Sequence, residues 1–169
     1  MATIVRTANE EDTRAIARIH VDAWRAAYRG HVPDDYLDKL DVDLRVHAWK
    51  DILTAPGSTL LAVQEDDTVG FCHLCQSRDG DADDSVAEIT SIYVSPLEWH
   101  SGVGRTLCTQ ALRLAESAGF AIVTLWVLES NQPARSFYEE MGFTLDGAGK
   151  TEERGGVELR EVRYRHTLD

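Results

Sequence analysis

The stretch SIYVSPLEWHSGVGRTL, residues 91–107, joins the end of an apolar, β-branched segment to the start of a helical pattern. Gly102 and Gly104 flank one valine at the junction. Two structures fit these glycines. One is a tight turn. The other is an anion site, in which free amides at the start of a helix carry partial positive charge and glycines let a phosphate approach the backbone. The stretch alone does not choose between them.

Several common nucleotide and hydrolase motifs are absent. The dinucleotide fingerprint G-x-G-x-x-G requires a third small residue at position 107, where this chain has Leu107. The chain contains no G-x-x-x-x-G-K-[ST], no G-x-S-x-G and no H-E-x-x-H. The sequence therefore gives no support to a Rossmann enzyme, a P-loop enzyme, an α/β-hydrolase or a zinc protease of that type.

After the glycines, the patterning predicts a helix, a buried strand over 120–128, a helix over 133–142 and a closing hairpin of 143–153 with 157–168. Gly119 has the position of a C′ glycine for the first helix, and Pro133 that of a first-turn proline for the second. The predicted buried face of the first helix is Val103, Leu107, Ala111, Leu114 and Ala118, and that of the second is Ala134, Phe137, Tyr138 and Met141.

Before the glycines, the patterning predicts a strand over 3–7, three helices, a hairpin and a central strand over 86–94. Asn9 is the expected N-cap of the first helix, which Gly30 ends. The hairpin strands are 59–65 and 68–76, with Asp66 and Asp67 as the turn. Strands followed and preceded by helices in this order predict an α/β (α+β) fold, a mixed central sheet flanked by helices, in a single domain over 1–169.

Composition limits the partners. The formal net charge of −12 disfavours nucleic acid and anionic membranes, which bind through Lys and Arg, although it could attract a cationic substrate. The N-terminus lacks a long apolar stretch, which predicts a cytoplasmic protein. The pair Cys72 and Cys75 resembles half of a zinc site, but no second pair follows, and on a strand the two side chains point to opposite faces. We expect no metal.

A second motif lies downstream, in LESNQPARSFYEEMGF at 128–143. Together the two motifs make the chain resemble the GNAT superfamily of N-acetyltransferases, well over residues 60–165 and more loosely before them. The resemblance rests on the family's pyrophosphate motif Q/R-x-x-G-x-G/A, here from Trp99 to Gly104, and on N-x-x-A-x-x-F-Y-x-x-x-G-F, here from Asn131 to Phe143. Trp99 is a departure, since the family has Gln or Arg at that position and a basic residue shortly after it.

The resemblance implies acetyl-CoA as the donor and a primary amine that attacks the thioester directly. It implies that the pyrophosphate lies over 100–105 and that the pantetheine arm pairs with the 92–94 backbone. Asn131 would hold that arm or cap the next helix. Arg105 and Arg135 would supply the missing positive charge. The implied cofactor-binding residues are Ile92, Tyr93, Val94, His100, Ser101, Gly102, Val103, Gly104, Arg105, Asn131 and Arg135.

Two residues are predicted to be catalytic. Tyr138 matches the family's general acid, which would protonate the leaving thiolate; the alternative is a core aromatic residue. Glu88, on the central strand, is the candidate base for the amine, because burial would raise its pKa toward the useful range; the alternative is an exposed strand residue. Tyr93 and Glu98 are further candidates for the base.

The acceptor site is expected between the first two helices and the hairpin. Trp24 and Tyr28 are candidate substrate-binding residues there, although i and i+4 aromatic residues also simply pack a helix. The expected substrate is a small cationic amine such as a polyamine. The alternatives are a protein N-terminus or lysine, and, from another class, a non-catalytic acyl-CoA sensor. By analogy with relatives, a homodimer is possible.

Overall fold

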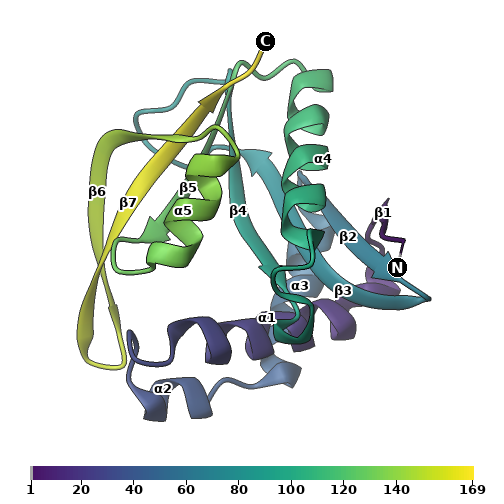
Figure 1. Ribbon diagram of the computed structural model, residues 1–169, viewed down its shortest axis with the longest axis vertical. Coiled ribbons are helices and arrows are strands. Elements are labelled where there is room, and N and C mark those ends of the chain that lie inside the picture. Colours follow the sequence, from purple (N-terminus) through teal and green to yellow (C-terminus); the bar gives the residue numbers. More distant parts are fainter. Residues whose placement is uncertain (1) are drawn as a thin grey trace.

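The computed structural model describes residues 2–169 and contains one seven-stranded sheet with helices on both faces (Figure 1). The strands are β1 (Ile4–Thr7), β2 (Ser58–Gln64), β3 (Asp67–Gln76), β4 (Val86–Val94), β5 (Ile122–Leu128), β6 (Thr144–Arg154) and β7 (Val157–Thr167). The helices are α1 (Thr13–Tyr28), α2 (Asp34–Asp38), α3 (Val42–Thr54), α4 (Val103–Ser117) and α5 (Gln132–Glu140), with 3-10 turns η1 (Glu10–Asp12) and η2 (Pro96–Glu98).

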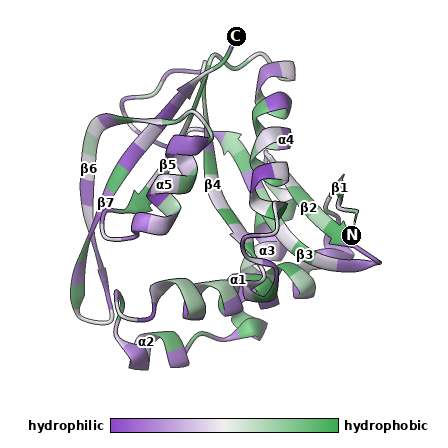
Figure 2. Cartoon of the chain, in the orientation of Figure 1, coloured by the Kyte–Doolittle hydropathy of each residue, from purple (hydrophilic) through white to green (hydrophobic). Residues whose placement is uncertain are grey.

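The sheet is mixed, as the sequence predicts. Its strand order is β1-β2-β3-β4-β5-β7-β6. Only β4 and β5 are parallel, because α4 crosses over between them, and every other neighbouring pair is antiparallel. Apolar residues are concentrated in the central strands, whereas the edge strand β6 is more hydrophilic (Figure 2).

Two hydrophobic clusters cover the two faces of the sheet. Alternate residues of a strand point to opposite faces, and on β2 Leu60 and Ala62 belong to the cluster that α4 and α5 cover, while Leu61 belongs to the cluster under α1 and α3. A third cluster joins α1 and α2 to the end of β5 through Tyr28, Leu37 and Leu128. The first two helices are thereby fixed over the carboxyl end of β5.

Three details differ from the prediction. The hairpin turn falls at Glu65 and Asp66, both with positive φ, one residue earlier than predicted. Asn9 caps the 3-10 turn η1, and the α-helix proper starts only at Thr13. The last buried residue of α4 is Ala115 and not Ala118, as the predicted face had it. Ala118 is exposed, because the helix ends at Ser117 and the chain then turns at Gly119.

The central pair of strands separates after three residue pairs. β4 and β5 are paired only from Val86–Ile122 to Glu88–Thr124. On the other side of β4 the register with β3 shifts, so that Thr90 is an extra residue between Ile89 and Ser91. A bulge of this kind bends its strand. The carboxyl half of β4 thus diverges from β5, and a gap opens in the middle of the sheet.

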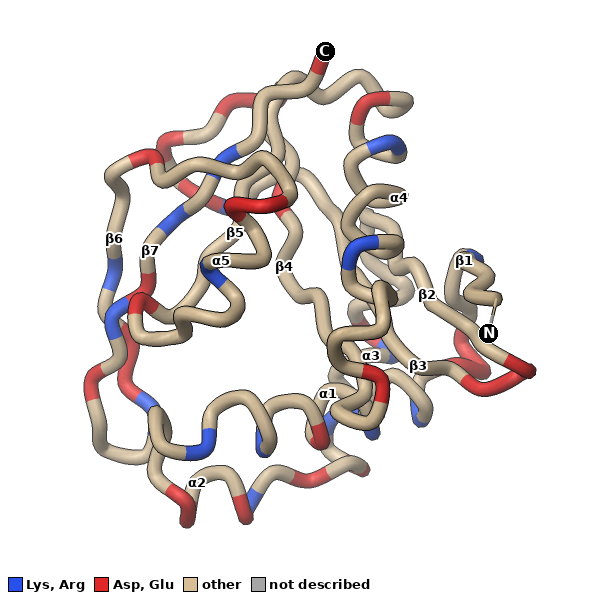
Figure 3. Tube along the Cα trace, in the orientation of Figure 1, with Lys and Arg blue, Asp and Glu red and all other residues tan. Residues whose placement is uncertain are grey.

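The charged residues do not form one dominant patch. Acidic residues occur on nearly every segment, and Lys and Arg lie among them on α1, α4, α5 and β7 (Figure 3). Within residues 2–169, none of the helices is both long enough and apolar enough to cross a bilayer.

Candidate active site

A cavity of about 860 Å³ lies where β4 and β5 separate. Six parts of the chain line it: α1, β4 from Ile89 onward, the turn before α4, the first turn of α4, β5 and the region of α5. Its ionisable side chains other than tyrosines are Glu98, His100, Arg105 and Glu140, all near the first turns of α4 or on α5. We call this the donor end. The other end, lined by α1, Tyr93 and Trp126, we call the acceptor end.

The turn before α4 presents backbone amides to the donor end. His100 and Gly102 both have positive φ, of 64° and 91°, and α4 begins at Val103. The first bond of the helix to the carbonyl of Gly102 comes from Thr106. The amides of Val103, Gly104 and Arg105 therefore have no helical acceptor. This arrangement suits an anion, as the glycine pattern indicated.

Gly104 keeps that end open. A Cβ atom built on Gly104 would meet the ring of Phe137 at 3.5 Å and the side chain of Val94 at 3.8 Å. Any larger side chain would therefore extend into the space between α4, β4 and α5. Gly102 has a different role, because its φ of 91° is one that L-residues rarely adopt, while the space around it is open.

The second half of β4 offers backbone hydrogen-bonding groups to the cavity at every second residue. The amide of Ser95 donates to Val69 on β3 at 2.8 Å, so residues 91, 93 and 95 direct their backbone groups toward β3. Ile92 and Val94 then direct theirs toward the gap. Of the three predicted backbone contacts, the structure favours Ile92 and Val94. The backbone groups of Tyr93 face β3 instead, although Tyr93 is also one of the residues that line the cavity.

The other predicted donor-site residues are in different situations. Asn131 lines the cavity and also caps α5, accepting a bond from the Ala134 amide at 3.3 Å, so both predicted roles remain available to it. Arg105 lines the cavity and pairs loosely with Glu140 at 3.6 Å. Arg135 instead donates to the Tyr164 hydroxyl and to the Glu129 carbonyl, and the side chain of Ser101 donates to the carbonyl of Glu98. Neither Arg135 nor Ser101 is among the lining residues.

Tyr138 lies on α5 and lines the cavity. Its ring packs between Phe137 and Phe143, with centroids 5.4 and 6.0 Å away. Burial, together with the nearby Tyr93 hydroxyl and the thiols of Cys108 and Cys72, raises the pKa of Tyr138 well above its ordinary value. A phenol keeps its proton at neutral pH even at its ordinary pKa, so the Tyr138 hydroxyl is present as a proton donor, although the shift makes it a weaker acid than an exposed tyrosine.

Glu88 is buried as predicted, with 2% of its surface exposed, but it does not line the cavity. Its Oε2 accepts a bond from Arg78 Nη2 at 2.8 Å, and its Oε1 accepts one from the Arg78 amide at 3.1 Å. Both oxygens are thus engaged in holding the segment after β3 against β4. This position favours a structural role, and the prediction of a base gains no support from it.

Aromatic side chains form the acceptor end. Tyr28 lines the cavity, and its hydroxyl lies 3.5 Å from that of Tyr93. Burial is the main reason why the pKa values of both phenols are raised. Trp24 is not a lining residue; it packs edge-on against Tyr28, with centroids 4.5 Å apart, and its buried indole nitrogen has no hydrogen-bond partner among the described residues. Trp24 thus packs the helix, while Tyr28 reaches the cavity.

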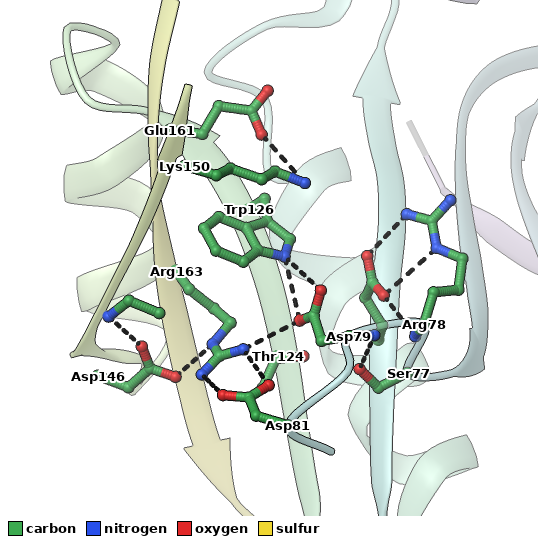
Figure 4. A network of polar contacts seen from close by, with 12 residues as sticks. Ser77, Arg78, Asp79, Asp81, Thr124, Trp126, Asp146, Lys150, Glu161 and Arg163 are labelled. Atoms are coloured by element: carbon green, nitrogen blue, oxygen red, sulfur yellow. Dashed lines mark hydrogen bonds and ion pairs between the residues drawn. The ribbon is translucent and has the colours of Figure 1, made fainter. Parts of the chain in front are cut away.

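Trp126 is a lining residue that the sequence did not single out. Its indole nitrogen donates to both carboxylate oxygens of Asp79 at 3.1 Å, and Lys150 Nζ lies 4.4 Å from the ring centre. Figure 4 shows Arg163 beside it, bridging Asp79, Asp81 and Asp146. Trp126 occurs within an apolar strand pattern, and its partners come from a distant loop, so no local signal marks it.

Cys72 and Cys75, the pair that resembles half of a zinc site, both lie on β3. Cys72 is fully buried under α4, whereas Cys75 is partly exposed, and both are free thiols. Across residues 2–169 there is no cluster of three or more His, Cys, Asp or Glu side chains with the geometry to hold a metal ion.

Comparison with curated proteins gives N-acetyltransferases along most of the chain. The chain is 29% identical over 159 residues to the uncharacterized N-acetyltransferase YuaI of Bacillus subtilis, covering 94% of this chain and 89% of that protein. It is 23% identical to spermidine N(1)-acetyltransferase of Thermoplasma acidophilum, covering 86% and 91%.

Two solved structures share the fold at 20% identity. The PaiA N-acetyltransferase of T. acidophilum, in complex with coenzyme A, superposes with a TM-score of 0.76 over 99% of this chain and 100% of that one. The putative acetyltransferase yncA of Salmonella typhimurium, with its cofactor acetyl-CoA, has a TM-score of 0.77 over 100% and 95%. The model of the acetyltransferase (GNAT) family matches residues 7–143. The chain belongs to the GNAT family of acetyltransferases.

Proposed function

We propose that this acetyl-CoA-dependent acyltransferase acetylates a small primary amine at the point where β4 and β5 separate. The observation that carries the proposal is that one cavity joins the free amides of the α4 N-terminus, the gap-facing backbone of Ile92 and Val94, and the protonated Tyr138. An anion site, an extended-chain site and a proton donor in one space are what direct transfer from a CoA thioester requires.

In this proposal, the donor's pyrophosphate binds at the amides of 100–105, with Arg105 as the nearest cation. The pantetheine arm lies along Ile92 and Val94, with Asn131 opposite on α5. The amine nitrogen forms a bond to the acetyl carbon, the carbon–sulfur bond breaks, and the sulfur takes a proton from Tyr138. The amine attacks as its free base, and after the attack its nitrogen gives a proton to water, from which the Tyr138 phenolate takes back the proton it donated.

The acceptor end favours an amine with an apolar body. Its lining includes Ala23, Ala27, Tyr28, Tyr93 and Trp126, and no Asp or Glu among the described residues lines that end. Such a surface stabilises an apolar group and offers ring faces to a single ammonium. Arylalkylamines and other monoamines with an apolar substituent therefore fit it better than a chain carrying several charges.

A polyamine is the second candidate. Two observations favour it: the formal net charge of −12, which attracts cations, and the resemblance to a spermidine acetyltransferase. Acidic residues lie near the acceptor end without lining it, among them Glu161, whose pKa burial raises. A polyamine would have to reach them with its far end.

The test is release of free thiol from acetyl-CoA with a panel of arylalkylamines, polyamines, amino acids, aminoglycosides and peptides with free N-termini. We expect the highest kcat/KM with an arylalkylamine. A preference for spermidine would favour the second candidate, and a preference for peptides would favour the alternative of a protein acetyltransferase. Binding of acetyl-CoA with no thiol release across the panel would favour a non-catalytic sensor. Cytoplasmic location and a homodimer remain predictions, the second testable by light scattering.

A further inference from the structure

Trp99 stands where relatives have Gln or Arg, and the structure shows what its side chain does. The indole nitrogen donates a hydrogen bond to the carbonyl of Val94 at 2.8 Å, while 39% of the residue stays exposed. The two residues are the last of β4 and the residue after η2, so the bond closes the segment between them into a loop. Trp99 also lines the cavity at its donor end.

The Val94 carbonyl that accepts the Trp99 hydrogen bond is one of the β4 backbone groups that face the gap between β4 and β5. Val94 directs its backbone groups away from β3, because Ser95 and not Val94 bonds to that strand. The bond therefore satisfies the last outward-facing carbonyl of β4. It leaves the carbonyl of Ile92 and the amides of Ile92 and Val94 free to pair with an extended ligand.

The residues that follow Trp99 are in conformations that need support. His100 has φ of 64°, which is uncommon for a residue with a side chain, and Gly102 has φ of 91°. The backbone of the loop is attached to β3 by the Ser95 amide, which donates to the Val69 carbonyl at 2.8 Å. Its other bonds are internal: Glu98 and Trp99 donate to Ser95 and Pro96, and the side chain of Ser101 donates to Glu98. The Trp99–Val94 bond is the side-chain contact that ties this loop to the sheet.

We infer that Trp99 is a positioning residue for the donor's pyrophosphate. It contacts no phosphate through a polar group. It fixes the turn so that the amides of 100–105 point into the cavity, and it thereby replaces a direct side-chain contact by preorganised backbone donors. The inference rests on the proposed function, since it assumes that the pyrophosphate binds at this turn.

The test compares two ligands in one variant. Trp99→Phe keeps a ring and removes the N–H donor. We expect it to raise the Kd of CoA about 3- to 10-fold, the range of one net hydrogen bond. We expect the Kd of pantetheine, which lacks the pyrophosphate, to change less than about twofold. Calorimetry measures CoA, and an NMR titration reaches the weaker pantetheine affinity.

Leu97→Ala is the matched control, because Leu97 lies in the same loop and is 93% exposed; we expect it to leave both affinities unchanged. Thermal unfolding of Trp99→Phe checks that the fold is kept. Equal losses for both ligands would overturn the inference in favour of direct contact with the pantetheine arm. Tighter pantetheine binding would overturn it by showing that the indole competes with the ligand for the Val94 carbonyl. Unchanged Kd values for both ligands would overturn it by showing that the Trp99–Val94 bond is not needed to position the loop. Failure of the wild-type protein to bind CoA would instead contradict the proposed function.

Discussion

The two ends of the cavity are built in different ways. The donor end offers backbone groups beside its ionisable side chains: the amides at the start of α4, the outward-facing groups of Ile92 and Val94, and two glycines. The acceptor end consists of side chains from α1, β4 and β5. A backbone amide or carbonyl is present whatever side chain a residue carries, whereas side-chain chemistry changes with the residue. The difference teaches why the donor is recognisable from a motif while the acceptor has to be inferred from surface chemistry.

The largest effect is expected between the two ends, at Tyr138. Tyr138→Phe removes the proton donor and keeps the ring, so turnover should fall about 10²- to 10³-fold, within the range of acid–base groups, while the Kd of acetyl-CoA stays nearly constant. Steady-state kinetics and calorimetry on the same preparation measure the two quantities. Unchanged turnover would remove Tyr138 from the mechanism.

His20, which stacks on Tyr93 behind the acceptor end, should make the free energy of unfolding decrease in acid. Burial, and to a lesser extent the charge of Arg45, lowers the pKa of His20 from 6.5 to about 3, and its Nδ1 accepts a bond from Trp49 while its ring stacks on Tyr93. The unfolded chain then binds a proton that the folded one does not. The contribution of His20 to the free energy of unfolding is fully present above pH 6.5. Between pH 6.5 and about 3 it is lost, by at most about 1.4 kcal/mol per pH unit.

Denaturant unfolding at pH 7, 6, 5 and 4 measures this loss. The lowered pKa of His73 contributes in the same direction and is present in all variants. His20→Gln keeps an acceptor for Trp49 but cannot titrate, so its stability should fall less steeply between pH 6.5 and 4. An identical slope in the variant would show that His20 is not the group responsible.

The two glycines that flank α4 form a matched pair, and one of them, Gly102, lies at the donor end. Gly102 and Gly119 lie at opposite ends of α4, both with φ of 91° and both with no atom within 4 Å of an added Cβ. Alanine at either position should cost a similar strain of about 1 to 2 kcal/mol in unfolding experiments. Only Gly102→Ala should also weaken CoA, by about tenfold, because it displaces the amides that bind an anion. Equal CoA affinities in the two variants would place the pyrophosphate elsewhere.

The smallest effect is expected at Tyr28. Tyr28→Phe removes a hydroxyl that lies 3.5 Å from Tyr93 and keeps the buried ring. The KM of the amine should rise about two- to fivefold, the range of one weak polar contact, with the KM of acetyl-CoA unchanged. A larger change in the acetyl-CoA KM than in the amine KM would mean that the two ends have been assigned in reverse.

The sequence predicted the helices and strands around the donor end well, for a local reason. Helix starts, left-handed glycines and the capping of α5 by Asn131 are decided within a few residues, so spacing and residue type are enough to find them. The same locality explains the agreement over the strands. It also explains the errors at Asp67 and Ala118, because element boundaries depend on small differences that residue type does not resolve.

Glu88 shows where local reasoning fails. The sequence correctly predicted a buried carboxylate on the central strand, but it did not predict that Arg78 engages both of its oxygens. Trp126 is the converse case: its place in the cavity depends on Asp79 and on the separation of β4 from β5, and neither is a property of its own segment.

By itself, therefore, the sequence determined the family, the order of the elements and the glycine turn before α4, because these depend on short-range spacing. The tertiary structure decided three things that depend on distant segments: the extra residue Thr90 that opens the sheet, the aromatic surface of the acceptor end, and the bond from Trp99 to Val94. Through that bond the Trp99 side chain holds the loop before α4 to the last residue of β4, a contact between segments that the local sequence pattern does not show.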